Sequence, residues 1–249
     1  MNMKIIQYDI RAVWNENKVK YMVFAGFIII ACICCNHSCK KLLSVDMGFW
    51  DYILWNLRGM KVIRKNEYIV PNAYWVFIQL YLAVVVGVYP VKDLHMAGQQ
   101  ILLKSGNRKA WWFGKVIWNI LSVLGFYLVL YLSVTAVSIV TGGFKAAQPE
   151  VAAFLLENQK IENAGTELYM YAMAVPVIVS LAIAVTQMMI AVVFQPPMGY
   201  IWVCAVIAAG IFIYSPYSLG NYLMLMRTPV LLHLSLIHIS EPTRQAEIS

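Results

Sequence analysis

The chain has 249 residues, of which 61% are hydrophobic and 12% charged, and its mean hydropathy is +0.67. A typical soluble domain carries about 25% charged residues, so this composition argues against a soluble fold and favours a chain embedded in lipid. The formal net charge is +7. Because the basic residues lie in short stretches between long uncharged runs and form no nucleic-acid-binding motif, we exclude nucleic acid as a partner.

The N-terminal segment from Met3 to Lys18 is predicted to be an amphipathic interfacial helix. Its apolar residues recur at helical spacing and its basic residues fall on another face, which is typical of helices that lie on a membrane surface. The alternative is a solvated turn that leads into the first span. A second amphipathic segment is expected from Met47 to Met60, with its apolar residues on one side.

Five segments approach or meet the length needed to cross a bilayer, which is about 20 mostly apolar residues. They lie at 21–35 (with uncharged residues continuing to Cys39), 71–89, 116–144, 168–194 and 200–219. The last two form one uncharged region, and the turn Gln195-Pro196-Pro197-Met198-Gly199 divides it into a helical hairpin. The predicted fold is therefore all-α, a polytopic transmembrane helix bundle with amphipathic interfacial helices.

Aromatic residues gather at the ends of these segments, as they do at membrane interfaces. We expect Tyr89, Trp111 and Trp112, together with the basic Lys115, to anchor the chain at headgroup depth. The total of basic residues on the two sides does not decide the orientation. The loop at 91–115 has five basic residues and one acid, whereas the loop at 145–167 has two basic residues and four acids. The first loop, and with it the N-terminus, is therefore expected to be cytoplasmic.

One cluster has residue types that bind metals: Cys32, Cys34, Cys35, His37 and Cys39. Thiolates and an imidazole can hold copper(I) or zinc. The first three cysteines, however, lie at an apolar helix end, where cysteine commonly packs as a small hydrophobe, and no second spaced pair follows. We interpret the cluster as packing and assign no metal site, with a local disulfide as the alternative if this end faces outward.

Motifs of enzyme sites are absent. The sequence has no G-x-x-x-x-G-K-[ST] phosphate loop, no H-E-x-x-H and no G-x-S-x-G, and the last four predicted spans contain no charged residue that would mark a proton relay. We therefore predict that the chain is not itself an enzyme and holds no cofactor of its own.

The segment from Tyr89 to Ile120 resembles the membrane subunits of type-two ABC exporters of Gram-positive bacteria. The resemblance rests on a Tyr-Pro that leaves a span, an Asp three residues later, a Gly-Gln pair, a Lys-Ser-Gly turn and an Arg-Lys-x-Trp-Trp-x-x-Lys that enters the next span. The matching residues are Tyr89, Pro90, Asp93, Gly98, Gln99, Ser105, Arg108, Trp111, Trp112 and Lys115. A second similarity is Gly220-Asn221-Tyr222.

The resemblance implies a bacterial plasma-membrane permease subunit with six spans, whose loop between spans two and three contacts a separate cytosolic ATPase. ATP and Mg would be bound by that ATPase, and the other partners would be a second permease copy or homologue and the lipid bilayer. Apolar residues of the loop recur at helical spacing, as in a short helix that docks in a groove. The expected interface residues are Asp93, Leu94, Gly98, Gln99, Ile101, Lys104 and Arg108.

The C-terminal residues Leu234 to Ser249 resemble a translated sequencing adapter, because eleven consecutive residues from Leu234 to Arg244 match an in-frame reading of transposase-adapter DNA. We expect residues 1–233 to be a C-terminally truncated permease domain and 234–249 a non-native tail. The sixth span would then lie beyond the junction. An alternative function is a membrane sensor or anchor that binds a partner or anionic lipid through its basic loop, and a weaker one is a membrane enzyme whose site lies in the missing part.

Overall fold

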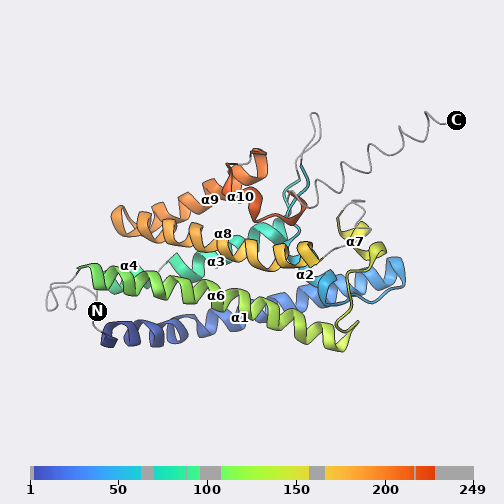
Figure 1. Ribbon diagram of the computed structural model, residues 1–249, viewed down its shortest axis with the longest axis horizontal. Helices are drawn as coiled ribbons and strands as arrows, with labels where there is room; N and C mark the ends of the chain where they lie inside the picture. The colour runs from blue at the N-terminus through green and yellow to red at the C-terminus, as the bar shows by residue number, and fades with distance from the viewer. Residues whose placement is uncertain are drawn as a thin grey trace.

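The computed structural model describes residues 3–62, 70–87, 89–95, 108–156, 166–215 and 217–227. These ranges contain helices and no strand, which confirms the all-α fold class for this part of the chain (Figure 1). The elements are α1 (Met3–Leu43), α2 (Phe49–Leu57), α3 (Ala73–Gly87), α4 (Tyr89–His95), α6 (Arg108–Val140), α7 (Pro149–Leu155), α8 (Thr166–Val193), α9 (Pro196–Phe212), α10 (Leu219–Tyr222) and the short 3-10 helix η1 (Leu225–Arg227).

Four helical stretches are long and apolar enough to cross a membrane: Arg11–Leu43, Ala73–Leu94, Trp111–Val140 and Leu168–Val193. They correspond to the first four predicted spans. The fifth predicted span is α9, which has only 17 residues and ends at Phe212 instead of Leu219. Ile213 is already extended, and the chain reaches Pro216 soon after, which a helix interior does not tolerate.

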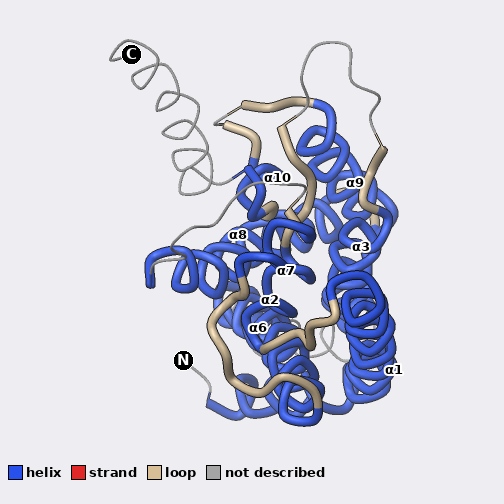
Figure 2. Tube along the Cα trace, turned by 90° about the vertical axis from the view of Figure 1, so that its right-hand side faces the viewer, coloured by secondary structure: helices blue, strands red, loops and turns tan. Residues whose placement is uncertain are grey.

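The long helices lie side by side along one axis and alternate in direction (Figure 1). Helix α1 packs mainly on α6, while α8 packs on α6 and α9, and α3 fits against α8 and α9. Figure 2 looks along this axis from the end of the bundle that carries α2 and α7. The core between α1 and α6 is aromatic, with the rings of Phe24 and Phe126 stacked 4.1 Å apart.

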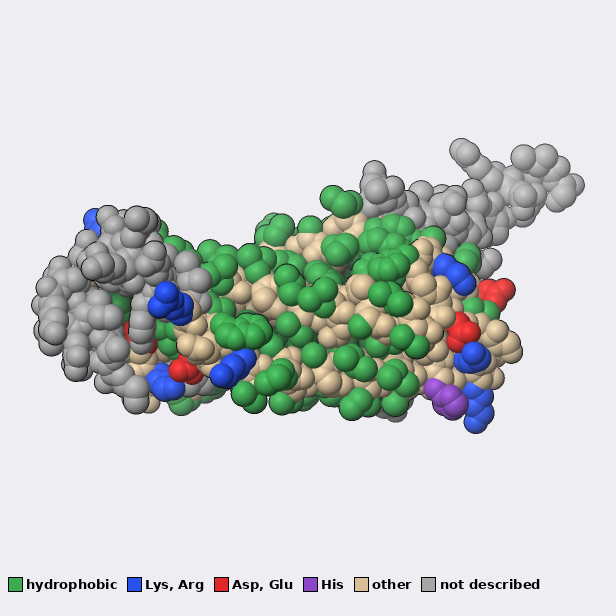
Figure 3. Space-filling model, turned by 90° about the horizontal axis from the view of Figure 1, so that it is seen from below, with side chains coloured by type: hydrophobic (Ala, Val, Ile, Leu, Met, Phe, Trp, Pro, Cys, Tyr) green, Lys and Arg blue, Asp and Glu red, His purple; other side chains and the backbone are tan. Residues whose placement is uncertain are grey.

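The outer surface has the pattern of a membrane protein. On the face in Figure 3, charged side chains gather toward the two ends of the long axis and the middle is largely apolar. Large apolar side chains such as Ile30 (65% exposed), Leu128 (56%) and Ile178 (63%) point outward from α1, α6 and α8. Exposed apolar area of this extent is rare on soluble monomers, so it supports the membrane-spanning interpretation of these helices.

Two predicted amphipathic segments differ from expectation. The segment Met3 to Lys18 is the beginning of α1, which runs through both it and the first span as one 41-residue helix, because no proline or glycine separates the two. The segment Met47 to Met60 contains α2, whose side chains are nearly all buried. Buried side chains lie on every side of α2. Helix α2 is therefore an internal helix at one end of the bundle and not a surface helix.

Candidate functional site

A buried polar group lies where α4 meets α6, at the end of the bundle opposite α2 and α7 (Figure 1). Helix α4 begins at Tyr89-Pro90, and proline suits the first turn of a helix because its missing N–H would have no helical partner there. Tyr89 and Asp93 are four residues apart on α4, and Trp111 and Lys115 are four apart on α6. This spacing brings each pair onto one helical face.

Asp93 and Lys115 form a buried ion pair across these two helices. The Lys115 Nζ lies 2.8 Å from the Asp93 Oδ2, and the two side chains are only 2% and 3% exposed. The Trp111 indole Nε1 donates a second hydrogen bond to the same carboxylate oxygen, at 3.2 Å. Desolvating two charges is costly unless each finds close partners, and here the carboxylate has one from a cation and one from an indole.

Aromatic rings enclose the ammonium group. The Lys115 Nζ lies 4.7 Å from the centre of the Tyr89 ring and 5.8 Å from that of Trp111, within the range of cation–π attraction. Its distance to the Tyr89 hydroxyl is 3.5 Å. Tyr89 in turn stacks on Trp118 of α6, with ring centres 4.4 Å apart. The cation is therefore held by a carboxylate, a phenol and two ring faces, which together exclude water.

Polar contacts of α1 with α3 and with α4 lie at the same end of the molecule. Lys20 of α1 donates to the last-turn carbonyl oxygens of Val84 and Val85 of α3, at 3.3 and 3.2 Å, where a cation suits the negative end of the helix dipole. An exposed ion pair joins Lys92 of α4 to Glu16 of α1 at 3.1 Å. A displacement of α4 would therefore displace both α1 and α6.

The predicted interface residues divide into three groups. Asp93, with the predicted anchors Tyr89, Trp111 and Lys115, belongs to the cluster just described. Leu94 is half-buried and Arg108 is exposed, and neither residue belongs to that cluster. The predicted anchor Trp112 is half-buried and also lies outside the cluster. Four predicted residues lie outside the described part of the chain: Gly98, Gln99, Ile101 and Lys104.

The expectation that Tyr89, Trp111 and Lys115 project to headgroups is not what the structure shows, because their side chains are buried at 5%, 5% and 2% exposure. Single-sequence reasoning treated Lys115 as a charge that must reach water. It missed the carboxylate of Asp93 across the loop, which provides the internal partner. The signal was present in the two four-residue spacings, which place an acid and a base on facing helices beside aromatic residues.

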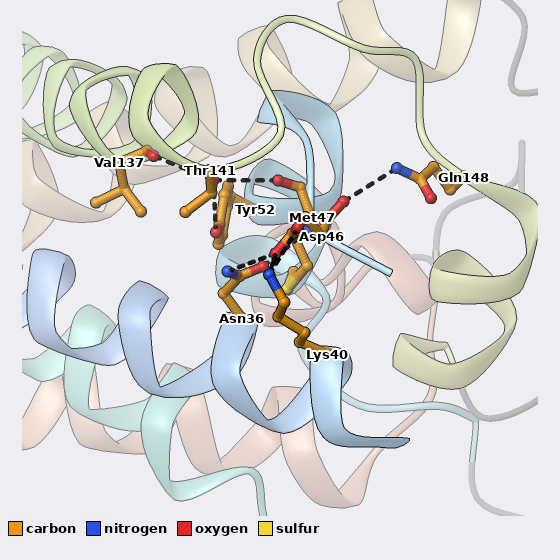
Figure 4. Close-up of polar contacts among 8 residues, drawn as sticks. All are labelled: Asn36, Lys40, Asp46, Met47, Tyr52, Val137, Thr141 and Gln148. Atoms are coloured by element: carbon orange, nitrogen blue, oxygen red, sulfur yellow. Dashed lines mark hydrogen bonds and ion pairs between the residues drawn. The ribbon is translucent and has the colours of Figure 1, made fainter. Parts of the chain in front are cut away.

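The opposite end of the bundle is organised by a different polar cluster (Figure 4). Asn36 of α1 accepts from the backbone N–H of Met47 at 2.9 Å, and Lys40 pairs with Asp46 at 3.0 Å. The Gln148 side chain donates to the Asp46 backbone carbonyl at 3.1 Å. One residue beyond α6, the Thr141 hydroxyl lies 3.3 Å from the Met47 carbonyl oxygen. The ends of α1 and α6 and the segments before α2 and α7 are thus joined through side chains and backbone.

Asp51 of α2 is fully buried. Its two carboxylate oxygens accept from the backbone N–H groups of Gly48 at 2.9 Å and Gln148 at 3.0 Å. Burial raises the pKa of Asp51 above its ordinary value, while the two backbone hydrogen bonds act in the opposite direction. Within the described ranges, no basic side chain forms an ion pair with it, so the group acts as a structural cap of α2 and of the segment before α7.

The Gly220-Asn221-Tyr222 segment forms α10 and has a structural role. A Cβ on Gly210 of α9 would lie 2.8 Å from the Gly220 Cα, so two glycine backbones are in direct contact. The Asn221 side chain donates to the carbonyl oxygens of Ile213 and Ser215 at 3.2 and 2.8 Å. It also accepts from the buried Arg227 at 2.8 Å.

Arg227 donates in addition to several backbone carbonyl oxygens, those of Met60, Lys61, Gly210 and Ile211. The guanidinium therefore closes the C-terminal end of α9 and joins it to the segment after α2. This explains why a polar Gly-Asn-Tyr motif can follow an apolar span.

The cysteine cluster contains no disulfide and no group of three or more metal-binding side chains among the described residues. Cys32 and Cys39 are buried, and Cys34 is exposed. The Cys32 sulfur accepts a long hydrogen bond, 3.6 Å, from the Asn56 amide. These contacts agree with the interpretation of Cys32 and Cys39 as packing residues.

Comparison of the chain with protein-family models, with curated proteins and with solved structures found no match.

Proposed function

We propose that this chain is a membrane-spanning permease subunit of an ABC exporter, coupled through the segment between α4 and α6 to a separate cytosolic ATPase. The proposal is supported by the resemblance carried by Tyr89 to Ile120 and by four long apolar helices. The observation that carries it is the buried Asp93–Lys115 pair, because this pair fastens together the two helices that flank the proposed coupling segment at 96–107.

In this mechanism the ATPase changes shape on hydrolysis and displaces the coupling segment. A flexible hinge at the base of that segment would absorb the displacement. The ion pair and its aromatic enclosure instead make α4 and α6 move as one unit, and the Lys92–Glu16 and Lys20 contacts pass the movement to α1. Coupling between the ATPase and the membrane helices requires an element whose position both of them influence, and the fastened α4–α6 unit is that element in this mechanism. The chain has no phosphate loop, so nucleotide chemistry belongs to the partner.

The test is co-purification. The tagged full chain, expressed with its neighbouring genes, is expected to retain an ATPase that has a phosphate-loop motif. Deletion of Leu94 to Lys104, or the substitution Ile101→Asp, is expected to abolish that retention. The matched control is Leu42→Asp, which places the same charge on an exposed residue at the other end of the bundle.

Three results would count against the exporter. Retention of the ATPase by the deletion variant would remove the coupling role from this segment. Retention of a kinase or regulator in place of an ATPase would favour the membrane sensor or anchor. Equal losses in Ile101→Asp and Leu42→Asp would indicate general misfolding and remove the support for a specific contact.

A further inference from the structure

A cleft of about 500 Å³ opens between α1, α2, α3 and α7, at the end of the bundle opposite the Asp93–Lys115 pair. Its wall includes Ala31 and Cys35 of α1, Trp55 of α2, Arg58 just beyond α2, Tyr74 of α3 and Phe154 of α7. None of the functions considered so far uses it.

The wall is apolar and aromatic. Trp55 and Tyr74 stack with ring centres 4.4 Å apart. The Tyr74 hydroxyl is turned to the protein, where it donates to the Asn56 side-chain oxygen at 2.6 Å. The polar end of the tyrosine is thus already satisfied, and the ring surfaces remain to line the cleft. A surface of this kind suits a hydrocarbon chain better than water.

The rim of the cleft on α1 is continuous with the lipid-facing surface. Cys34 lines the cleft and is exposed, and its neighbours Ile30 and Ile33 are 65% and 53% exposed. All three lie in the candidate span Arg11–Leu43. With this span in a bilayer, the molecules next to the opening are lipids.

The cleft carries one basic group and no acidic one among its described lining residues. The half-buried Arg58 donates from Nη1 to the Leu155 carbonyl at 2.9 Å. This contact orients the guanidinium and uses one of its five N–H groups. Asp51 of α2 and Asp46 just before α2 are engaged elsewhere, Asp51 by backbone N–H groups and Asp46 by Lys40. A guanidinium with free donors beside an apolar cleft matches a phosphate group attached to an acyl chain.

We propose that this cleft binds an anionic phospholipid, with an acyl chain against Trp55 and Tyr74 and the phosphate on Arg58. The proposal is independent of the exporter function, because it concerns the other end of the bundle and requires no ATPase.

The full chain is reconstituted in phosphatidylcholine vesicles that contain a small amount of a photoreactive lipid probe. The probe carries a diazirine in its acyl chain and is either a phosphatidylglycerol or a phosphatidylcholine. Cross-linked peptides are then mapped by mass spectrometry. We expect the phosphatidylglycerol probe to label the cleft wall at least about fivefold more than the phosphatidylcholine probe, the effect of one basic group on an anionic headgroup. Arg58→Gln should remove this preference and Arg58→Lys should keep most of it.

Two further variants separate the charge from the cleft. Lys41→Gln removes one charge from an exposed residue at the same end of the bundle and should leave the labelling unchanged. Ala31→Phe fills the cleft without changing any charge and should abolish labelling by both probes. It also keeps the proposal open to refutation if Arg58→Gln fails to fold.

Cys34 gives an independent measurement with a built-in control. Its alkylation should be slower in vesicles containing phosphatidylglycerol than in pure phosphatidylcholine, while alkylation of Cys204, which is exposed on α9, should not change. Equal labelling by the two lipid probes, equal loss in Lys41→Gln and Arg58→Gln, or labelling that persists in Ala31→Phe would overturn the proposal. Recovery of a bound peptide from the cleft would do the same.

Discussion

The two ends of the helix bundle each bury an aspartate, and they stabilise it in different ways. Asp93 is held by side chains of a neighbouring helix, namely Lys115 and Trp111. Asp51 is held by backbone N–H groups, those of Gly48 and Gln148. The side-chain pair fastens two helices to each other, whereas the backbone caps fix the chain just before a helix. The comparison assigns a side-chain clamp, which makes α4 and α6 move as one unit, to the α4–α6 end and a fixed cap to the α2–α7 end.

The largest expected effect is that of breaking the ion pair. Lys115→Met leaves the Asp93 carboxylate buried without its cation and should lower the free energy of unfolding by about 3–5 kcal/mol. The double variant Asp93→Asn with Lys115→Met removes both charges and should recover most of the loss. Thermal unfolding of the detergent-solubilised chain measures both. A double variant no more stable than Lys115→Met would show that the pair is not what stabilises this end.

At the fixed end, Asp51→Asn should lower the free energy of unfolding by about 1–3 kcal/mol, because the amide offers one acceptor to two backbone N–H donors and turns its own NH₂ toward one of them. The double variant with Lys115→Met should show additive losses, because the two sites lie at opposite ends of the bundle. Coupling between them would contradict the separation into two independent regions.

The pH dependence should also distinguish the fixed cap. The pKa of Asp51 is raised in the folded state above its ordinary value of 3.8, so the folded state holds the proton more tightly than the unfolded state. Stability contributed by this group is present below pH 3.8 and is lost as the pH rises through the raised value, by less than about 1.4 kcal/mol per pH unit. Wild type should therefore lose stability relative to Asp51→Asn as the pH rises above 3.8. A flat difference between the two would contradict this.

Asp46 should act in the opposite direction. The hydrogen bond from Lys40 lowers its pKa below 3.8, so its contribution is present above that pH and is lost only as the pH falls through the lowered value. Asp46→Asn should remove this loss of stability at acidic pH and leave the pH dependence of the free energy of unfolding above pH 3.8 unchanged. The two aspartates thus act in separate pH ranges.

The smallest effect is expected from Trp111→Phe. This change removes the indole hydrogen bond to Asp93, but the carboxylate keeps Lys115, so the loss should be about 1 kcal/mol. Trp112→Phe is the matched control, because Trp112 is half-buried outside the cluster, and it should change the unfolding temperature less. The reverse order would move the site away from Trp111.

Sequence reasoning located the long helices because uncharged apolar runs leave few other folds for a chain in lipid. It failed where the surroundings of a residue depend on distant segments. Met47 to Met60 was predicted to be amphipathic because its apolar residues recur on one side, which leaves Asp51 and Asn56 on the other. Their hydrogen-bond partners, however, are the Gly48 and Gln148 N–H groups, the Tyr52 carbonyl and the Tyr74 hydroxyl, and some of these lie far away in sequence. The candidate site was predicted only in part. Its residues were identified from the sequence motif, but Lys115 was expected to contact headgroups and not Asp93.

The shortness of α9 bears on how this helix could cross a bilayer. A helix of 17 residues is about 25 Å long, whereas a typical hydrocarbon core is about 30 Å thick. With α9 across a bilayer, the bilayer around it would thin locally, or the irregular chain after Phe212 would enter the hydrocarbon region. Irregular backbone is tolerated there only when the protein itself satisfies its polar groups. Arg227 and Asn221 supply such hydrogen bonds to the carbonyls of Gly210, Ile211, Ile213 and Ser215, which equips this corner of the molecule for a local mismatch in hydrophobic thickness.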